Sequence, residues 1–412
     1  MANAREMSVL RSLGSQVRAI SEQPQQQETI ARWQDLNRLQ PQRPMVLIDQ
    51  IPWHEMDVDG ELVLQCEDPF CRQLEWELRQ ILYKWKHMPV DMVVEPYLDI
   101  PIHILGMDYG ITAQETVAVK DARNDVKGHF YHDQLQDEGD LEKIRMPQIR
   151  VDAEATERDL EQAHRIFDGV LLLRSQGKLP NFALWDRIVE WRGAQNVLLD
   201  LAVRPDFIHA IMERLTKALL SMVDQLEAQG LLPKSQLTTH CSGAHSTELP
   251  APGYDPAKPR LKDLWTHGMA QIFASVSPAM HKEFELDYAR EFYARSGLVY
   301  YGCCEPLDGK LDLIKDIPNL RKISMSPWVD QERGAAGIGS QFVFSRKPNP
   351  AFLAAPRWEP EVVAEDIRAT MATAKRHGCP LEFILKDIST VNYEPQRLWQ
   401  WAALVMELVQ EA

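Results

Sequence analysis

Residues 298–306 read LVYYGCCEP. Four residues of high β-propensity are followed at once by a glycine, two adjacent cysteines, a glutamate and a proline. A buried parallel strand that delivers polar groups to the mouth of an α/β barrel has this pattern, because all strand ends of such a barrel meet on one face. Thiols and a carboxylate at that position indicate a site rather than packing. The stretch therefore predicts a barrel strand with a functional site at its carboxyl end.

Similar short apolar runs recur on both sides of this stretch and alternate with helical patterns. They occupy residues 45–49, 92–97, 181–186, 321–326, 341–345 and 381–387. A further strand is expected at 236–241 or at 270–275, and we favour the second. This alternation, without a glycine-rich phosphate turn, favours an α/β fold of the (β/α)8 TIM barrel class over a Rossmann fold.

Two additions to the barrel are predicted. Residues 1–43 form an N-terminal helical extension that ends before Pro44, and the barrel then occupies 44–412. Within the barrel, residues 106–178 read as an insertion made of a β-hairpin, turning at Arg123-Asn124-Asp125, and a charged helix. Either addition could pack against a second copy of the chain, so a homodimer is possible.

The composition is acidic. The 412 residues carry 45 lysines and arginines against 60 aspartates and glutamates, for a formal net charge of −15. Such a chain is a poor partner for nucleic acid or an anionic membrane, which leaves small molecules or a protein with a basic docking face. No window approaches the ~18 consecutive apolar residues of a membrane helix, and the Gln-rich start lacks the apolar segment of a signal peptide. We expect a cytoplasmic protein with reduced thiols.

The cysteines suggest zinc chemistry. A catalytic Zn²⁺ uses three ligands such as thiolates and imidazoles and keeps one position open. Cys303, Cys304 and Glu305 are the first ligand set proposed, with His240 and Cys241 next. Such a zinc would hold a substrate thiol as a thiolate that accepts a methyl group. The alternative is two packed thiols beside a pocket. Adjacent strand residues face opposite ways, so both cysteines serve one site only if the strand ends at the glycine before them.

Carboxylates follow several of the predicted strands. Glu95, Asp186 and Asp387 each lie at or near such a strand end. At the mouth of a barrel these groups could position a substrate or act as acid and base. They are the catalytic residues that the sequence proposes.

Three stretches resemble the uroporphyrinogen decarboxylase superfamily. Residues 270–275, leading to Ser277-Pro278, are similar to that family's fourth strand and following helix. Residues 342–353 resemble its seventh strand with an Asn-Pro-Ala-Leu-type turn, and residues 383–387 fall where its last strand carries Leu-Gly-His-Gly. The resemblance covers roughly residues 44–412. It implies a TIM barrel with decarboxylase or methyltransferase activity.

Within that family the chain looks more like the methyltransferase branch. The decarboxylase pattern fails, because Ile48-Asp49-Gln50 stands where an arginine-rich strand end is expected and Lys386-Asp387 replaces the final histidine. The methyltransferase branch uses a His-x-Cys and a distant cysteine for zinc. Here Cys303-Cys304 occupies the central strand without the histidine, and no cysteine lies near Asp387.

The resemblance thus implies an enzyme that moves a methyl group between a small substrate and a thiol or a corrinoid carried by a partner protein, with assistance by zinc possible. The main alternative is a decarboxylase, a carboxy-lyase acting on a less anionic substrate than uroporphyrinogen. The non-enzymatic alternative is a barrel that binds a ligand or a partner.

Overall fold

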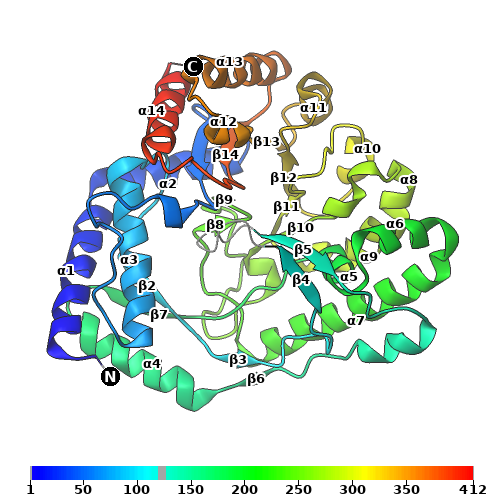
Figure 1. Ribbon diagram of the computed structural model, residues 1–412, viewed down its shortest axis with the longest axis horizontal. Coiled ribbons are helices and arrows are strands. Elements are labelled where there is room, and N and C mark those ends of the chain that lie inside the picture. The colour runs from blue at the N-terminus through cyan, green and yellow to red at the C-terminus, as the bar shows by residue number, and fades with distance from the viewer. Residues whose placement is uncertain (1, 119–126, 412) are drawn as a thin grey trace.

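A parallel six-stranded sheet forms the centre of the computed structural model, which describes residues 2–118 and 127–411 (Figure 1). Its strand order is β1-β14-β13-β12-β11-β10. The strands are β1 (Met45–Ile48), β10 (Trp265–Gly268), β11 (Leu298–Tyr301), β12 (Leu320–Met325), β13 (Val343–Arg346) and β14 (Leu381–Leu385). All six are lined by buried residues, as expected for strands covered on both faces. The predicted α/β class is confirmed.

The other strands form four small two-stranded sheets. β2 (Tyr97–Pro101) pairs in parallel with β7 (Leu172–Gln176), while the antiparallel pairs are β3 (Ile104–Leu105) with β6 (Arg150–Val151), β4 (Glu115–Ala118) with β5 (Gly128–Tyr131), and β8 (Thr238–Thr239) with β9 (Ser242–Gly243). The predicted hairpin is therefore present as β4 and β5. Its expected turn, Arg123-Asn124-Asp125, lies outside the described residues.

The six-stranded sheet is extended at each end by single links. At the β1 edge the Asp91 amide donates to the Val46 carbonyl at 3.0 Å. At the β10 edge Phe182 forms an isolated parallel bridge with Gly268. In the described part of the chain no continuous ladder joins β10 back to β1, so the closed eight-stranded barrel stays a prediction.

Helices surround the sheet in Figure 1. They are α1 (Ala4–Ser21), α2 (Pro24–Asn37), α3 (Pro69–His87), α4 (Ala153–Phe167), α5 (Leu184–Arg192), α6 (Ala194–Val203), α7 (Pro205–Gln229), α8 (Pro278–His281), α9 (Asp287–Arg295), α10 (Leu311–Ile314), α11 (Gln331–Ile338), α12 (Ala351–Ala354), α13 (Pro360–His377) and α14 (Gln396–Gln410). Local sequence fixes their ends: Asp68 caps α3 before Pro69, and α13 stops at Gly378 with φ 67°. Among the described helices, none is long and apolar enough to cross a membrane.

Two expected strands differ from the structure. Pairing of the second strand begins at Tyr97, not at residue 92, because Pro96 has no amide hydrogen to donate to a ladder. Glu95 therefore precedes β2 instead of ending a sheet strand. In the segment 181–186 only Phe182 makes a bridge, and α5 begins at Leu184. Asp186 thus lies in the first turn of a helix.

Neither residues 236–241 nor residues 270–275 form a strand of the six-stranded sheet, so the preference for 270–275 was wrong. Residues 271–275 form a 3-10 helix, and the sheet strand is β10, just before them. Residues 238–239 belong to the β8–β9 hairpin outside the six-stranded sheet. A short apolar run does not distinguish a strand from a buried helical turn by periodicity.

The β8–β9 hairpin is anchored to both the N-terminal helices and the sheet. The Asn37 side-chain amide at the end of α2 donates to the Gly243 carbonyl at 3.0 Å. Gly243 lies under the Trp33 ring, where an added Cβ would come within 2.4 Å of a ring atom, so only glycine fits. On the sheet side, Lys322 Nζ contacts Glu382 Oε2 at 2.9 Å. Lys322 donates to the hydroxyl of the hairpin's Ser242, which in turn donates to Glu382.

Candidate active site

β11 ends where the sequence predicted it would end. The strand stops at Tyr301, and Gly302 follows with φ 93°, a left-handed conformation that favours glycine. The chain therefore leaves the strand before the two cysteines. Ser324 on the neighbouring β12 fixes the loop by donating to the Cys303 carbonyl at 2.8 Å. Because the alternation of a strand no longer applies, both thiols turn to the same place.

Four side chains meet at the ends of β11 and β14, and we name Cys303, Cys304, Lys386 and Asp387 the thiol cluster. Lys386 Nζ donates to Cys303 Sγ at 3.0 Å. The two sulfur atoms lie 3.5 Å apart, and Cys304 Sγ lies 3.3 Å from Asp387 Oδ2. Cys303 is only 4% exposed, while Cys304 is half-buried. The sequence had placed three of these residues at one site but had given Lys386 no role.

The contacts separate the two thiols electrostatically. The hydrogen bond with Cys304 and the charge and hydrogen bond of Lys386 lower the pKa of Cys303, against the opposing effect of burial. The same hydrogen bond, together with burial, raises the pKa of Cys304. Burial lowers the pKa of Lys386, but the charges of Cys303 and Asp387 outweigh it and raise that pKa. These contacts favour the thiolate form of Cys303 beside the Lys386 ammonium and the protonated form of Cys304.

Asp387 is held in an unusual backbone conformation. Its φ is 57°, in the left-handed region that a residue other than glycine seldom adopts. The Asp387 amide donates to Gln50 Oε1 at 3.1 Å, which links the end of β14 to the residues after β1. Strain of this kind persists where the surroundings enforce it and is common at functional sites. Here it turns the carboxylate toward Cys304.

Glu305 holds the loop of the thiol cluster through hydrogen bonds from backbone amides. Its buried carboxylate accepts the Cys303 amide at 3.0 Å and the Ala270 amide at 3.2 Å. The charge of Glu305 also acts on Asp186. Burial, followed by this charge, raises the pKa of Asp186 to about 6. Asp186 Oδ2 also accepts from Gln271 Nε2 at 3.4 Å. Asp186 thus approaches the site from helix α5 rather than from a strand.

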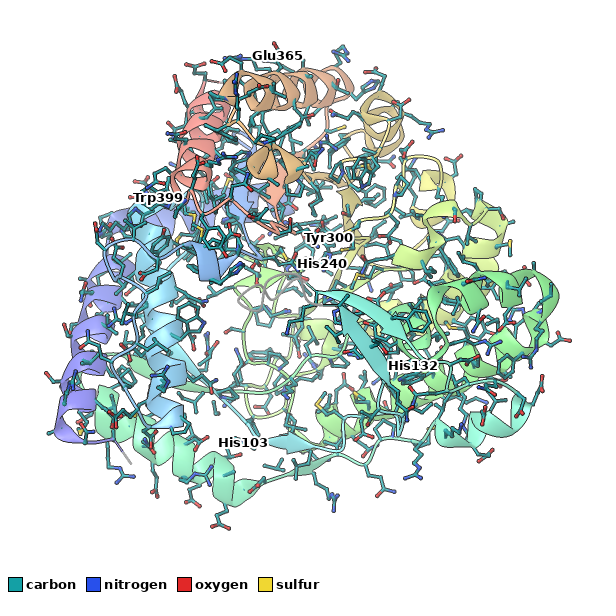
Figure 2. The ribbon with its side chains drawn as sticks, viewed as in Figure 1. His103, His132, His240, Tyr300, Glu365 and Trp399 are labelled. Atoms are coloured by element: carbon teal, nitrogen blue, oxygen red, sulfur yellow. The ribbon has the colours of Figure 1, made fainter. Side chains whose placement is uncertain are left out.

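His240 and Cys241 reach the interior of the molecule, not an outer insertion. They are the two central residues of the β8–β9 turn, and both have positive φ (44° and 68°). Such two-residue turns normally carry Asn-Gly, so His-Cys is a costly choice there. The His240 ring centroid lies 4.9 Å from that of His267 and 5.2 Å from that of Tyr300. Figure 2 shows His240 and Tyr300 together near the centre of the molecule.

The two turn residues are held in their uncharged forms. Burial, then the charges of His267 and two lysines, lowers the pKa of His240, and its buried Nε2 has no hydrogen-bond partner among the described residues. Burial, then the charge of Asp49, raises the pKa of Cys241 to about 12. Both shifts favour the neutral side chain, an imidazole for His240 and a thiol for Cys241. Cys241 in particular differs from Cys303 in this respect.

A second buried lysine lies near this group and was missed from the sequence. Lys347, just after β13, contacts the Tyr300 hydroxyl and donates to Ser345 Oγ at 2.9 Å. Burial, opposed by the charge of Glu382, lowers the pKa of Lys347 to about 8. A lysine directly after a buried strand was the available signal, as it was for Lys386.

The proposed zinc ligands do not form a metal site in this structure. Among the described residues, no three His, Cys, Asp or Glu side chains are grouped so that they could hold a metal ion. Cys303 instead accepts from the Lys386 ammonium, Glu305 is used by two backbone amides, and His240 projects from a different turn. A cation beside Cys303 would meet the charge of Lys386. The residues as placed therefore do not fit zinc.

Glu95 is not brought to the thiol cluster. Arg174 on β7 pairs with it at 3.1 Å and with Asp99 on β2 at 2.6 Å. Both contacts are made by Arg174 of the separate β2–β7 sheet. The structure gives Glu95 the role of an ion-pair partner there.

A cavity of about 430 Å³ lies near these elements, with walls from β1, α3 and the β8–β9 hairpin. It is lined by Trp33, Trp53, Ile48, Asp49, Gln50, Glu77, Ile81, Lys84, Cys241 and His245, among others. Its Gln50 bonds to Asp387 of the thiol cluster, so one hydrogen bond separates the cavity from the cluster.

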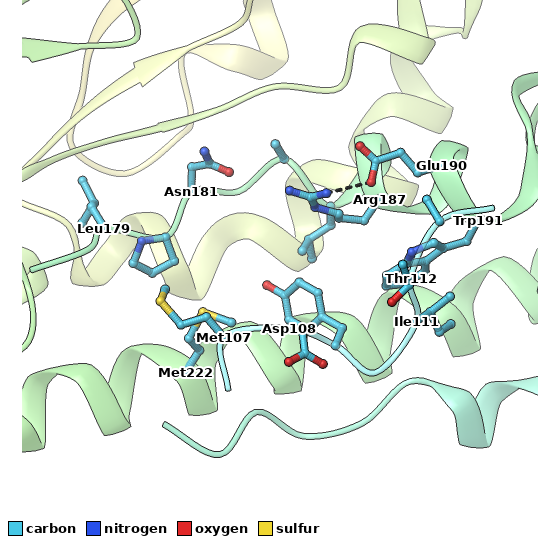
Figure 3. A pocket seen from close by; sticks show the side chains of 15 residues that line it. Met107, Asp108, Ile111, Thr112, Leu179, Asn181, Arg187, Glu190, Trp191 and Met222 are labelled. Carbon is cyan, nitrogen blue, oxygen red and sulfur yellow. Dashed lines mark hydrogen bonds and ion pairs between the residues drawn. The ribbon is translucent and has the colours of Figure 1, made fainter. Parts of the chain in front are cut away.

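A larger cavity, of about 590 Å³, lies elsewhere (Figure 3). It is bounded by residues 107–113, the start of α5 and Met222 on α7, with an Arg187–Glu190 ion pair of 2.7 Å in its wall. None of the site residues proposed from the sequence lines it. Size alone therefore does not mark the chemical centre, and the smaller cavity is the one connected to it.

Comparison with known proteins gives distant structural likenesses. No family model and no curated protein matches the chain. A solved structure of a methyltransferase from Methanosarcina mazei is similar in chain path, with a TM-score of 0.49 and 12% identity over 92% of this chain and 98% of that one. At this similarity we take neither activity nor site residues from that protein. The function is built instead on the thiol cluster.

Proposed function

We propose that the chain is an enzyme that transfers a methyl group between a small substrate and the thiolate of Cys303. The observation that carries the proposal is the 3.0 Å contact between Cys303 Sγ and Lys386 Nζ. A thiolate, not a thiol, is the nucleophile, and an adjacent cation favours that form at neutral pH. The pair lies at the carboxyl ends of β11 and β14, where side chains of parallel strands meet.

The proposed step is a displacement at carbon. A sulfur electron pair of Cys303 forms the S–CH3 bond while the bond between the methyl carbon and its carrier breaks. The electron pair of that bond leaves with the carrier, which takes up a proton if it departs as a base. The Lys386 ammonium holds the sulfur in its charged form until attack, and its side chain is itself buried. Asp387 and Cys304 stand beside the sulfur and can exchange a proton with the departing group.

The cavity of about 430 Å³ is the proposed substrate site. Its walls are mostly apolar and include two tryptophans, which suits a small methylated molecule. Its one side-chain carboxyl from α3 is Glu77, whose pKa is raised to about 7 by burial, followed by the charge of Asp99. That group could give or take a proton near neutral pH. The link from Gln50 to Asp387 places this cavity next to the thiol cluster.

The family resemblance adds a partner and a metal to the proposal. The partner is a separate corrinoid protein that exchanges the methyl group with the enzyme. The metal is zinc, which the residues as placed do not fit, so no step of the reaction uses it here. Metal analysis decides this point: about one zinc per chain that is lost in a Cys303→Ser/Cys304→Ser variant would restore zinc to the mechanism.

Methylcobalamin, a free methylated corrinoid, is the probe that tests the proposal. The reduced protein is incubated with it, and the tryptic peptide of residues 296–310, which contains only Cys303 and Cys304 as cysteines, is analysed by mass spectrometry. We expect a methyl group on Cys303. The absorption spectrum of methylcobalamin should disappear at the same time. Cys379→Ser, which alters a thiol that donates a hydrogen bond to the Ala335 carbonyl, is the control and should behave as wild type. An unmethylated peptide, with turnover of a broad substrate set unaffected by Cys303→Ser, would overturn the proposal.

A carboxy-lyase is the second candidate, and one observation favours it. Lys347 and Lys386 are both buried beside His240, and such a group of donors could hold a substrate carboxylate. Decarboxylation would replace C–CO2⁻ by C–H, with the proton delivered by a neighbouring acid. Release of CO2 without metal, retained in Cys303→Ser but lost in Lys347→Met, would favour this candidate over methyl transfer.

A further inference from the structure

The two sulfur atoms of the thiol cluster are placed for a reaction with each other. Cys303 and Cys304 are adjacent in sequence, and their Sγ atoms lie 3.5 Å apart. Solvent reaches the cluster from the side of Cys304, because Asp387, which contacts its sulfur, has a side chain that is 45% exposed. One sulfur is paired with a cation, and the other still carries its proton. A cysteine whose thiolate is favoured by a neighbouring cation, next to a second cysteine that is a thiol, is the arrangement of a redox-sensitive pair.

We propose that Cys303 and Cys304 form a reversible oxidation site, in which a hydroperoxide oxidises Cys303 and Cys304 then closes a disulfide between adjacent residues. The proposal goes beyond methyl transfer. It rests on the placement of the two sulfurs and does not require any methyl donor. The chemical class of the reactant is a small peroxide, hydrogen peroxide or an alkyl hydroperoxide.

The oxidation has two steps. The Cys303 thiolate attacks the outer peroxide oxygen, the O–O bond breaks, and the departing oxygen takes a proton from solvent to leave as water or an alcohol. Cys303 is then a sulfenic acid, oxidised by two electrons, and the peroxide is reduced by two. Next Cys304 loses its proton to Asp387, 3.3 Å away, and attacks the Cys303 sulfur. The S–O bond breaks, the hydroxyl leaves as water with that proton, and the S–S bond forms.

The adjacency of the residues makes the product easy to reduce. Consecutive Cα atoms are about 3.8 Å apart, whereas disulfides usually join Cα atoms separated by about 4.4–6.8 Å. A disulfide outside the usual geometry is strained and therefore more readily reduced, which is the property of regulatory rather than structural bonds. A cellular thiol could reopen it. The oxidised form would lack the thiolate that methyl transfer needs, so peroxide would switch the enzyme off.

The remaining cysteines are unsuited to this chemistry. Burial raises the pKa of Cys66 to about 12 and that of Cys71 to about 11. The pKa of Cys241 is also raised to about 12 by burial. The Cys379 thiol donates a hydrogen bond to the Ala335 carbonyl, and burial raises its pKa to about 11. All four are therefore thiols at neutral pH and react slowly with peroxide. We expect oxidation to be confined to the thiol cluster.

The test is a titration of the full chain with hydrogen peroxide, followed by blocking of free thiols and mass analysis of residues 296–310. We expect that peptide to lose two hydrogens, to resist blocking at both cysteines, and to regain both thiols with dithiothreitol. In Cys304→Ser the disulfide cannot form, so dimedone should trap a sulfenic acid on Cys303, and sulfinic acid should accumulate about tenfold faster. Cys379→Ser is the matched control and should oxidise as wild type.

The wild-type result alone can overturn the proposal, whatever the folding of the variants. Free thiols at both positions after peroxide, or direct conversion of Cys303 to sulfinic acid without an intervening disulfide, would contradict it. These results are independent of the methylcobalamin experiment. A chain that forms the disulfide but accepts no methyl group would support the oxidation site and refute the proposed function.

Discussion

Cys303 and Cys241 offer a comparison of one side chain in two buried settings. The charge of Lys386 acts on both thiols and favours their ionised forms, and burial opposes ionisation of both. Cys303 contacts the ammonium at 3.0 Å and a second thiol at 3.5 Å, and its pKa falls. For Cys241, burial and then the charge of Asp49 raise the pKa to about 12. Direct contact with a donor, rather than proximity to a cation, decides which thiol ionises.

The difference also concerns how the two regions are built. Cys303 follows a regular sheet strand, and its loop is fixed by backbone contacts to Ser324 and Glu305. Cys241 sits in a strained hairpin turn that enters the interior from outside the sheet. The regular element presents the reactive group, and the irregular element presents an inert thiol to the cavity wall. Four substitutions test this contrast.

The largest effect is expected from removing the nucleophile itself. Cys303→Ser should reduce methyl transfer from methylcobalamin more than about a thousandfold, because an alcohol is not ionised at neutral pH. Cys241→Ser should change the rate less than about threefold, since that thiol is not the nucleophile. Initial rates at saturating donor measure both. Equal losses in the two variants would show that the contrast is mistaken.

The next largest effect concerns the anchor of the Cys241 hairpin. Lys322 and Glu382 are both fully buried and bind Ser242 of the hairpin. Glu382→Gln leaves the lysine without its counter-charge, which should lower the free energy of unfolding by about 3–5 kcal/mol. Urea denaturation followed by circular dichroism measures it. The double variant Lys322→Met/Glu382→Leu is the control and should be clearly less destabilised.

A smaller effect is expected when the cation of the thiol cluster is removed. Lys386→Met should raise the pKa of Cys303 and slow its alkylation at pH 7 by about 10- to 100-fold. Timed labelling with iodoacetamide and analysis of residues 296–310 gives the rate. Lys347→Met, which removes the neighbouring buried lysine that does not contact this sulfur, is the matched control. A similar loss in both variants would mean that general charge, not contact, controls the thiol.

The smallest effect should come from the neighbour of Cys241. Asp49→Asn removes the negative charge that, after burial, raises the pKa of Cys241. Its alkylation near pH 9 should rise by about three- to tenfold, because more thiolate is present at that pH. The tryptic peptide of residues 235–260 contains Cys241 as its one cysteine and reports the rate. An unchanged rate would leave burial as the whole cause of its inertness.

The sequence was informative where one regular element carries the site. The run at residues 298–306 predicted the strand β11, because β-propensity is a local signal. The condition under which both cysteines could serve one site, an end of the strand before Gly302, is met in the structure. The placement of Asp387 after the last strand followed in the same way. Strands β12, β13 and β14 also lie where alternating apolar runs predicted them.

The parts that could not be predicted depend on tertiary contacts. Lys386 was named only as the residue that replaces a family histidine, and nothing local says that its ammonium meets a sulfur 83 positions away. His240 and Cys241 were proposed as metal ligands, but only the packing of the hairpin against Trp33 and Lys322 determines what they face. Asp186 was misplaced because an apolar run before it fitted a strand as well as a helix.

The central claim is that Cys303 is a thiolate at neutral pH and Cys241 is not. The most direct measurement is the rate of iodoacetamide alkylation of each cysteine from pH 5 to 11, taken from the two tryptic peptides. Because the rate follows the thiolate fraction, Cys303 should reach half its maximum below the ~8.5 of an ordinary thiol, and Cys241 should stay nearly unreactive until far above it. A midpoint for Cys303 at or above that value, or a faster reaction at Cys241, would contradict the account.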